Sequence, residues 1–153
     1  MKKIIIVTNN IRLIKVECEI KYIKILYELL KSRREKITIS HSKVPTFKDH
    51  KTFVLSKPYR YWFLIEEKNI IVGSVYISKV NTIGIHFFRI GKKILGEVLL
   101  FLCKNIPPLK EIPSIRPPNF IINVANKNRA YANIIKKIGG IKIQETYAFD
   151  LKF

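Results

Sequence analysis

Apolar and polar residues follow two different periods along the chain, and the period distinguishes strands from helices. Residues 10–16 alternate and predict a strand, preceded by an edge strand at Ile4–Val7. Apolar residues spaced three and four apart predict amphipathic helices at Glu19–Lys31 and Asn128–Ile138. A strongly apolar helix is expected from Lys92 to about Asn105.

The middle of the chain predicts a short helix followed by three strands. Thr46 is a suitable N-cap for a helix that runs through Leu55. Three strand-like runs follow, joined by short polar connections that are typical of hairpins: residues 60–66, 70–78 and 82–88.

Prolines gather between residues 107 and 118 and indicate a loop. A buried strand is expected at Asn119–Val124, and a last strand at Ile141–Leu151 follows the Gly139-Gly140 helix stop. The predicted fold is α/β (α+β): a single mixed, mostly antiparallel sheet of about six to seven strands flanked by about four helices.

Length and composition narrow the class of protein. The 153 residues suit a single domain spanning 1–153, and 48% apolar with 26% charged residues is a globular composition. No apolar run reaches the roughly 18–20 residues of a membrane span, and no signal peptide is recognisable, so a soluble, cytoplasmic protein is expected. Cys18 and Cys103 lack metal-ligand spacing and are expected to be ordinary buried thiols, with no metal site.

The net charge of +18 suggests a polyanionic partner such as nucleic acid or a phosphorylated ligand. The basic residues are mostly lysines, and they are spread over both halves of the chain. A general bias toward isoleucine and lysine explains the excess equally well, so both interpretations stay open.

Four segments carry a resemblance to a known family. They are LYELLKSR (26–33), ITISHSKVPTFKDHKTFVLSKPYRYWFLI (37–65), GSVYISKVNTIGI (73–85) and NKNRAYANIIKKIGG (126–140). With them the chain resembles the GNAT superfamily of acyl-CoA-dependent N-acyltransferases, and within it a bacterial subgroup.

The resemblance implies that two central strands splay apart and that the pantetheine arm of acetyl-CoA bonds to backbone exposed in the gap. The strands are those at 82–88 and 119–124, and the backbone contacts fall at Ile85, Phe87 and Asn123. An extended ligand with amide groups would satisfy the N–H and C=O groups that such a gap leaves open.

The resemblance also places the pyrophosphate at the positive end of the helix that begins at Lys92. The remaining cofactor-binding candidates are Gly91, Lys92, Lys93, Gly96 and Asn128.

The cofactor loop departs from the family pattern of Gln/Arg-x-x-Gly-x-Gly/Ala. Ile90, Lys93 and Leu95 stand at its three specific positions. Lys92 and Lys93 either compensate with direct charge or are simply exposed lysines at a helix start.

Catalytic candidates follow from the same resemblance. The tyrosine that protonates the departing thiolate in many members corresponds to Ile135, which cannot transfer a proton. Tyr131, one turn earlier, either substitutes for it or packs in the core. As a base, His86 is expected to face the acceptor cleft, and His41 lies in a loop expected near the substrate; each has a purely structural alternative.

Three aromatic residues, Tyr59, Tyr61 and Trp62, either form a wall for a sugar or amine substrate or belong to the core. His50, on the short helix, is expected to be structural.

The leading function is an acetyl-CoA-dependent N-acetyltransferase acting on a small-molecule amine, with an amino sugar nucleotide as an acceptor by analogy. The alternative is a divergent GNAT-fold binding module for a polyanion or a protein, with nucleic acid the weaker choice. A protein α-amino acetyltransferase is a third reading, and pairing of the last strand across a homodimer is a further expectation.

Overall fold

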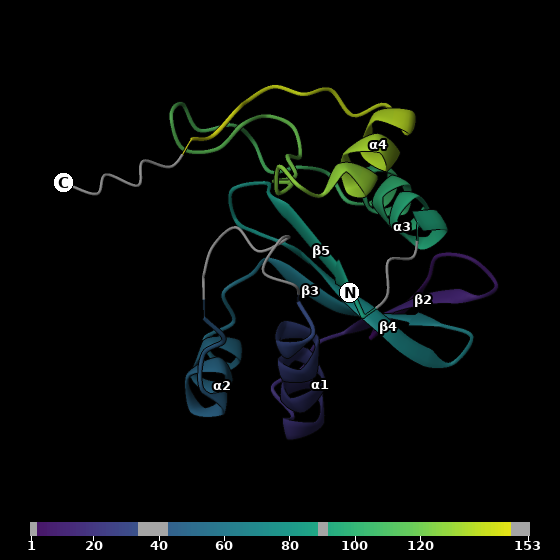
Figure 1. Ribbon diagram of the computed structural model, residues 1–153, viewed down its shortest axis with the longest axis vertical. Coiled ribbons are helices and arrows are strands. Elements are labelled where there is room, and N and C mark those ends of the chain that lie inside the picture. The colour runs from purple at the N-terminus through teal and green to yellow at the C-terminus, as the bar shows by residue number, and fades with distance from the viewer. Residues whose placement is uncertain (1–2, 34–42, 89–91, 148–153) are drawn as a thin grey trace.

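The sheet is antiparallel and contains five strands in the order β1-β2-β3-β4-β5 (Figure 1). The computed structural model describes residues 3–33, 43–88 and 92–147. The strands are β1 (Ile4–Ile6), β2 (Ile11–Lys15), β3 (Tyr61–Glu67), β4 (Ile70–Ile77) and β5 (Ile83–Phe87).

Helices cover both faces of this sheet. In Figure 1, α1 (Ile20–Lys31) and α2 (Phe47–Leu55) lie on one side, and α3 (Lys92–Asn105) and α4 (Arg129–Lys137) lie on the other. The mixed α+β fold is therefore confirmed, and the predicted helices and the first five predicted strands agree with these bounds to within about two residues.

Alternation along the strands divides the core between the two faces. On β3, Phe63 and Ile65 pack with α3 and α4, whereas Leu64 packs with α1 and α2. Successive side chains of a strand point to opposite faces, so one strand supplies both halves of the core.

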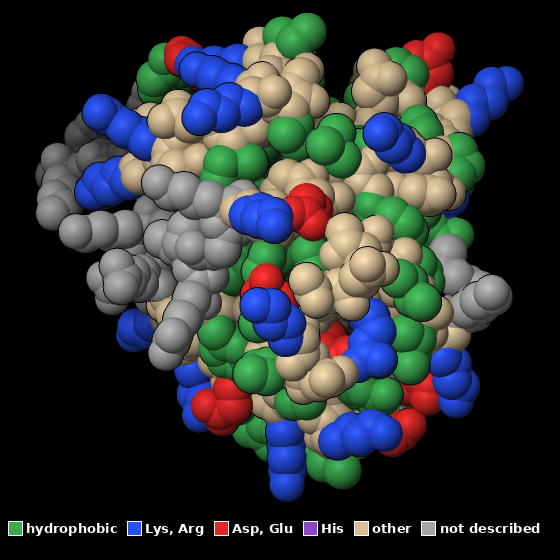
Figure 2. Space-filling model, turned by 90° about the vertical axis from the view of Figure 1, so that its right-hand side faces the viewer, with side chains coloured by type: hydrophobic (Ala, Val, Ile, Leu, Met, Phe, Trp, Pro, Cys, Tyr) green, Lys and Arg blue, Asp and Glu red, His purple; other side chains and the backbone are tan. Residues whose placement is uncertain are grey.

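Surface charge is distributed widely. On the face drawn in Figure 2, Lys and Arg side chains are spread over the whole surface, with Asp and Glu between several of them. This arrangement agrees with the diffuse lysine excess of the sequence.

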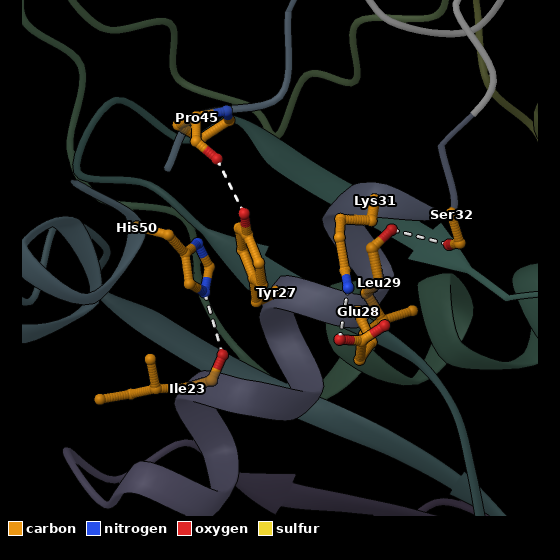
Figure 3. A network of polar contacts seen from close by, with 8 residues as sticks. All are labelled: Ile23, Tyr27, Glu28, Leu29, Lys31, Ser32, Pro45 and His50. Carbon is orange, nitrogen blue, oxygen red and sulfur yellow. Dashed lines mark hydrogen bonds and ion pairs between the residues drawn. The ribbon is translucent and has the colours of Figure 1, made fainter. Parts of the chain in front are cut away.

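The start of α2 is fastened to α1 by two polar contacts (Figure 3). The Tyr27 hydroxyl donates to the Pro45 carbonyl at 3.1 Å, and the Nε2 of the buried His50 lies 3.1 Å from the Ile23 carbonyl oxygen. The Thr46 hydroxyl accepts from the Asp49 N–H at 3.2 Å, as the predicted N-cap requires. His50 therefore has the structural role that the sequence predicts.

The expectation of six to seven strands is wrong for the described residues. The 119–124 segment joins the sheet only through a parallel bridge between Thr82 and Ile121. Residues 141–147 form no strand and lie in solvent, with Ile141 85% exposed. Alternating apolar and polar residues form a strand only where a neighbouring strand supplies hydrogen-bond partners for the backbone. No described strand does so for residues 141–147.

The two cysteines are exposed, which corrects the prediction that they are buried. Cys18 lies between β2 and α1, and Cys103 lies on the outer side of α3. Cysteine is among the residue types that are most often buried, which favours the prediction. The place of each cysteine in the fold decides its exposure.

No helix in the described part of the chain is both long and apolar enough to cross a membrane.

Asn81, between β4 and β5, organises the proline-rich loop. Its side chain is fully buried and makes three hydrogen bonds of 2.8 Å: its Nδ2 donates to the carbonyls of Leu109 and Pro117, and its Oδ1 accepts from the Leu109 N–H. Its own carbonyl accepts from the Ile121 N–H at 2.9 Å. One residue thus positions both the loop and the strand that follows it.

Replacing Asn81 by glycine should lower the free energy of unfolding by about 3 kcal/mol, because three buried hydrogen bonds lose their partner. Glycine tolerates the positive φ of 60° found here, so the loss reports on the side chain. Urea unfolding measures it. Asn105→Ala, which removes an exposed amide on α3, is the control, and equal losses in the two variants would contradict this role.

Candidate functional site

The outer edge of β5 presents backbone groups that the sheet does not use. The Phe88 N–H donates to the Val72 carbonyl, and the Thr82 carbonyl accepts from the Ser78 N–H. The even-numbered residues of this segment therefore direct their backbone N–H and C=O groups to β4. Because alternate residues of an antiparallel strand bond to the same neighbour, Ile85 and Phe87 direct N–H and C=O to the opposite edge.

The 119–124 segment meets this edge at one end only. Ile83 N–H donates to the Ile121 carbonyl at 2.8 Å. Beyond that point, no backbone hydrogen bond within the described residues joins Ile85 or Phe87 to the segment, and Asn123 is exposed. Within the described residues the pairing of β5 with this segment is therefore one-ended, and the splay implied by the family resemblance stays a prediction.

Tyr131 lies on α4 and is 9% exposed, whereas Arg33 follows α1 on the other side of the sheet. Burial raises the pKa of Tyr131 to about 12, and the positive charge of Arg33 partly opposes that rise. The Tyr131 phenol is protonated at neutral pH.

His86 projects from β5 onto the end of α1. It is 7% exposed, and its Nε2 lies 3.1 Å from the Leu29 carbonyl oxygen and 3.4 Å from the Ser32 hydroxyl. The carbonyl only accepts, so Nε2 carries the ring proton. Burial and, to a smaller extent, the charge of Arg33 lower the pKa of His86 to about 4, against the opposing effect of the bond to Leu29.

These properties make His86 a weak base. An efficient general base has a pKa near the working pH, and the proton-bearing Nε2 is committed to the backbone of α1. The structure thus favours the structural alternative for His86. His41, the other candidate base, lies outside the described residues.

An aromatic cluster of Phe53, Tyr59, Trp62 and Tyr76 covers the α1/α2 side of the sheet. Tyr59 stacks on Tyr76 with centroids 3.8 Å apart and meets Trp62 edge-on at 4.8 Å. A Cβ at Gly84 would lie 2.1 Å from the Tyr76 ring, so only glycine lets this ring lie over β5. Trp62 Nε1 is buried without a hydrogen-bond partner.

Tyr61 is not part of this cluster. It packs with the core on the α3/α4 side, where it stacks on Phe63 at 6.2 Å, and Arg60 lies over its ring. Tyr59 and Trp62 therefore lie together, whereas Tyr61 lies on the other face, because adjacent strand residues such as Tyr61 and Trp62 point to opposite faces.

The start of α3 offers little of the family's glycine cradle. Lys93 is exposed and lies 3.8 Å from Glu97, and Leu95 is fully buried. Gly96 is buried against α4, where a Cβ would lie 3.5 Å from Ile138. Its N–H belongs to the second turn of the helix, so a phosphate-binding role for Gly96 is not supported. Lys92 opens the helix, and Gly91 lies outside the described residues.

Asn128 has a local role: its Oδ1 accepts from the Tyr131 N–H at 3.4 Å and caps α4. The family resemblance predicted that Asn128 binds the cofactor, but its role as the N-cap of α4 is enough to explain an asparagine at this position.

Two residues of the site escaped sequence reasoning. Arg33 is the last residue of the LYELLKSR segment. Basic residues are common at the ends of helices, so its sequence position alone predicts no function. Tyr76 lies in an apolar strand and had no pattern of its own. No group of three or more His, Cys, Asp or Glu within the described ranges is arranged to hold a metal ion.

Solved structures of acetyltransferases share the fold of this chain. RimL, a ribosomal L7/L12 α-N-protein acetyltransferase in complex with coenzyme A, matches with a TM-score of 0.68 and 17% identity over 89% of this chain and 82% of its own. The microcin C7 self-immunity acetyltransferase MccE, in complex with acetyl-CoA and AMP, matches with a TM-score of 0.64 and 19% identity over 91% and 83%. A domain from Methanocaldococcus jannaschii matches with a TM-score of 0.65 and 21% identity over 89% and 91%.

Neither a family model nor a curated protein matches the sequence. The structural matches nevertheless show the fold: the chain has the GNAT fold of these acetyltransferases. Within that fold, the aligned enzymes include ones that acetylate a ribosomal protein and ones that confer self-immunity to microcin.

Stability should fall as the pH is lowered from about 6.5 toward 4. The pKa of His86 is about 4 when folded and 6.5 in its ordinary state, so the unfolded chain binds more protons in this window. The contribution of His86 is therefore complete above pH about 6.5 and is lost below it, with a slope of up to about 1.4 kcal/mol per pH unit.

Urea unfolding at several pH values measures this slope in the natural protein and in His86→Gln, which should show a shallower one. The pKa of His50 is also lowered by burial, so His50→Gln serves as a second reference. Identical slopes with and without His86 would show that its neutral form is not what the fold requires.

Proposed function

We propose that this chain is an acetyl-CoA-dependent N-acetyltransferase that acts on a primary amine. The observation that carries the proposal is the open edge of β5, where Ile85 and Phe87 direct backbone N–H and C=O into a gap between diverging segments. Buried backbone groups need partners, and an extended amide-containing arm fits such a gap.

The same geometry supports a site for the donor. The pantetheine amides pair with the backbone of Ile85, Phe87 and Asn123, and the pyrophosphate lies at the positive end of α3, near Lys93. Among the structural neighbours, RimL was solved with coenzyme A and MccE with acetyl-CoA. Direct charge from the exposed Lys93 takes the place of the missing glycines.

Acetyl transfer forms an amide bond and breaks a thioester. The uncharged amine nitrogen attacks the thioester carbonyl carbon, the carbon–sulfur bond breaks, the thiolate takes up a proton, and the amine nitrogen loses one. Tyr131 serves as the acid, because burial raises its pKa to about 12 and the phenol therefore holds its proton until a thiolate appears beside it.

The acceptor enters from the α1/α2 side, where the aromatic cluster lies. An aromatic surface suits the apolar face of a sugar or a base, which supports a small-molecule amine such as an amino sugar nucleotide. A protein α-amino group is the second candidate acceptor, because RimL, with the same fold, is a protein α-N-acetyltransferase.

Isothermal titration with acetyl-CoA and with desulfo-CoA should show saturable one-to-one binding that persists at moderate salt. Ile85→Pro should weaken it by about tenfold or more, because proline removes the edge N–H and leaves the bonds to β4 intact. Ile85→Val, which keeps the N–H, is the matched control. Absence of binding in the natural protein would contradict the enzyme and favour the binding-module alternative.

Tyr131→Phe should lower kcat by about a hundredfold while leaving acetyl-CoA affinity unchanged, as expected for loss of a general acid. Steady-state kinetics with a thiol reagent measure the rate, and titration measures the affinity. If the variant keeps its full rate, the hydroxyl only packs, and the proton comes from elsewhere.

A further inference from the structure

Arg33 is a half-buried cation at the end of α1. Its Nε is inaccessible to solvent and has no hydrogen-bond partner among the described residues. It follows Ser32, whose hydroxyl lies 3.4 Å from His86 Nε2, so the end of α1 is held against β5 at this point. A guanidinium is always charged in a protein, so its burial is costly unless something pairs with it.

Within residues 3–33, 43–88 and 92–147, the groups on which Arg33 acts do not neutralise it. Its charge acts on Tyr59, His86 and Tyr131, and all three are uncharged at neutral pH, since burial raises the pKa of both phenols and lowers that of the imidazole. No ion pair among the described residues involves Arg33. The protein thus maintains a cation among aromatic rings and a neutral histidine.

The donor is not the natural partner of this charge. Its pyrophosphate is placed at the start of α3, on the opposite face of the sheet from α1. The acceptor, in contrast, approaches over the aromatic cluster, and Tyr59 belongs to that cluster as well as to the surroundings of Arg33.

We propose that Arg33 binds an anionic group, a carboxylate or a phosphate, that the acceptor carries beside its amine. The planar guanidinium pairs with either group through parallel N–H donors, and such charge-assisted bonds are strong in a site shielded from water. The inference rests on the proposed acetyltransferase function and narrows its acceptors to anionic amines.

The kinetic test compares pairs of amines that differ only in the anionic group: serine with serinamide for the carboxylate, and glucosamine 6-phosphate with glucosamine for the phosphate. The natural enzyme should prefer the anionic member of at least one pair by about tenfold or more in kcat/KM. Arg33→Gln should abolish the preference, and Arg33→Lys should retain part of it.

Lys31→Gln is the matched control, because it removes one positive charge two residues away from an exposed side chain that pairs with Glu28. It should leave the preference unchanged. The acetyl-CoA affinity should be the same in the natural protein and in Arg33→Gln. Equal turnover of both members of each pair, an effect of Lys31→Gln as large as that of Arg33→Gln, or weakened acetyl-CoA binding in Arg33→Gln would overturn the proposal.

A binding experiment tests the anion site independently of the proposed acetyltransferase activity. The ring resonances of His86, assigned with His86→Gln, should shift saturably with inorganic phosphate or with acetate in the natural protein and not in Arg33→Gln. Saturable shifts without acetyl transfer would mean that the anion site exists and the enzyme assignment fails. No shift with either anion would overturn the anion site even if the protein transfers acetyl groups.

Discussion

The hydrogen bonds of Asn81 determine where the sheet stops and the gap begins. Its buried amide holds the proline-rich loop through Leu109 and Pro117, and its carbonyl receives the Ile121 N–H. The following segment is thereby joined to β5 at one end and is free to diverge at the other. The proposed cofactor site depends on that divergence, because it leaves the backbone N–H and C=O groups of Ile85 and Phe87 available to a ligand.

The same gap connects two faces that a continuous sheet would separate. Arg33 comes from the α1/α2 side and Tyr131 from the α3/α4 side, yet the charge of one acts on the pKa of the other. A low-dielectric surrounding strengthens this coupling and also suppresses ionisation of the histidine and tyrosines nearby. The positive charge of Arg33 thus acts on side chains that stay neutral at neutral pH.

Helix packing explains why the sequence at the start of α3 departs from the family's cofactor-loop pattern. Leu95 fills the core beneath α3, and Gly96 lies against α4, so these positions serve the contact between two helices. In the proposed function, phosphate binding at this helix would depend on its dipole and on lysine charge rather than on small residues. The structural neighbours share the fold at 17–21% identity, which leaves the acceptor to be determined from this chain's own residues.

The sequence by itself determined the helices and the first five strands, because periodicity and caps such as Thr46 are local signals. It also pointed to the splayed segments and to Tyr131 through the family resemblance. Only the tertiary structure decided that Tyr61 leaves the aromatic wall, that His86 is held neutral against α1, and that residues 141–147 find no neighbouring strand. The isolated charge of Arg33 and the role of Asn81 likewise required the fold, because burial and hydrogen-bond partners arise from segments far apart in the chain.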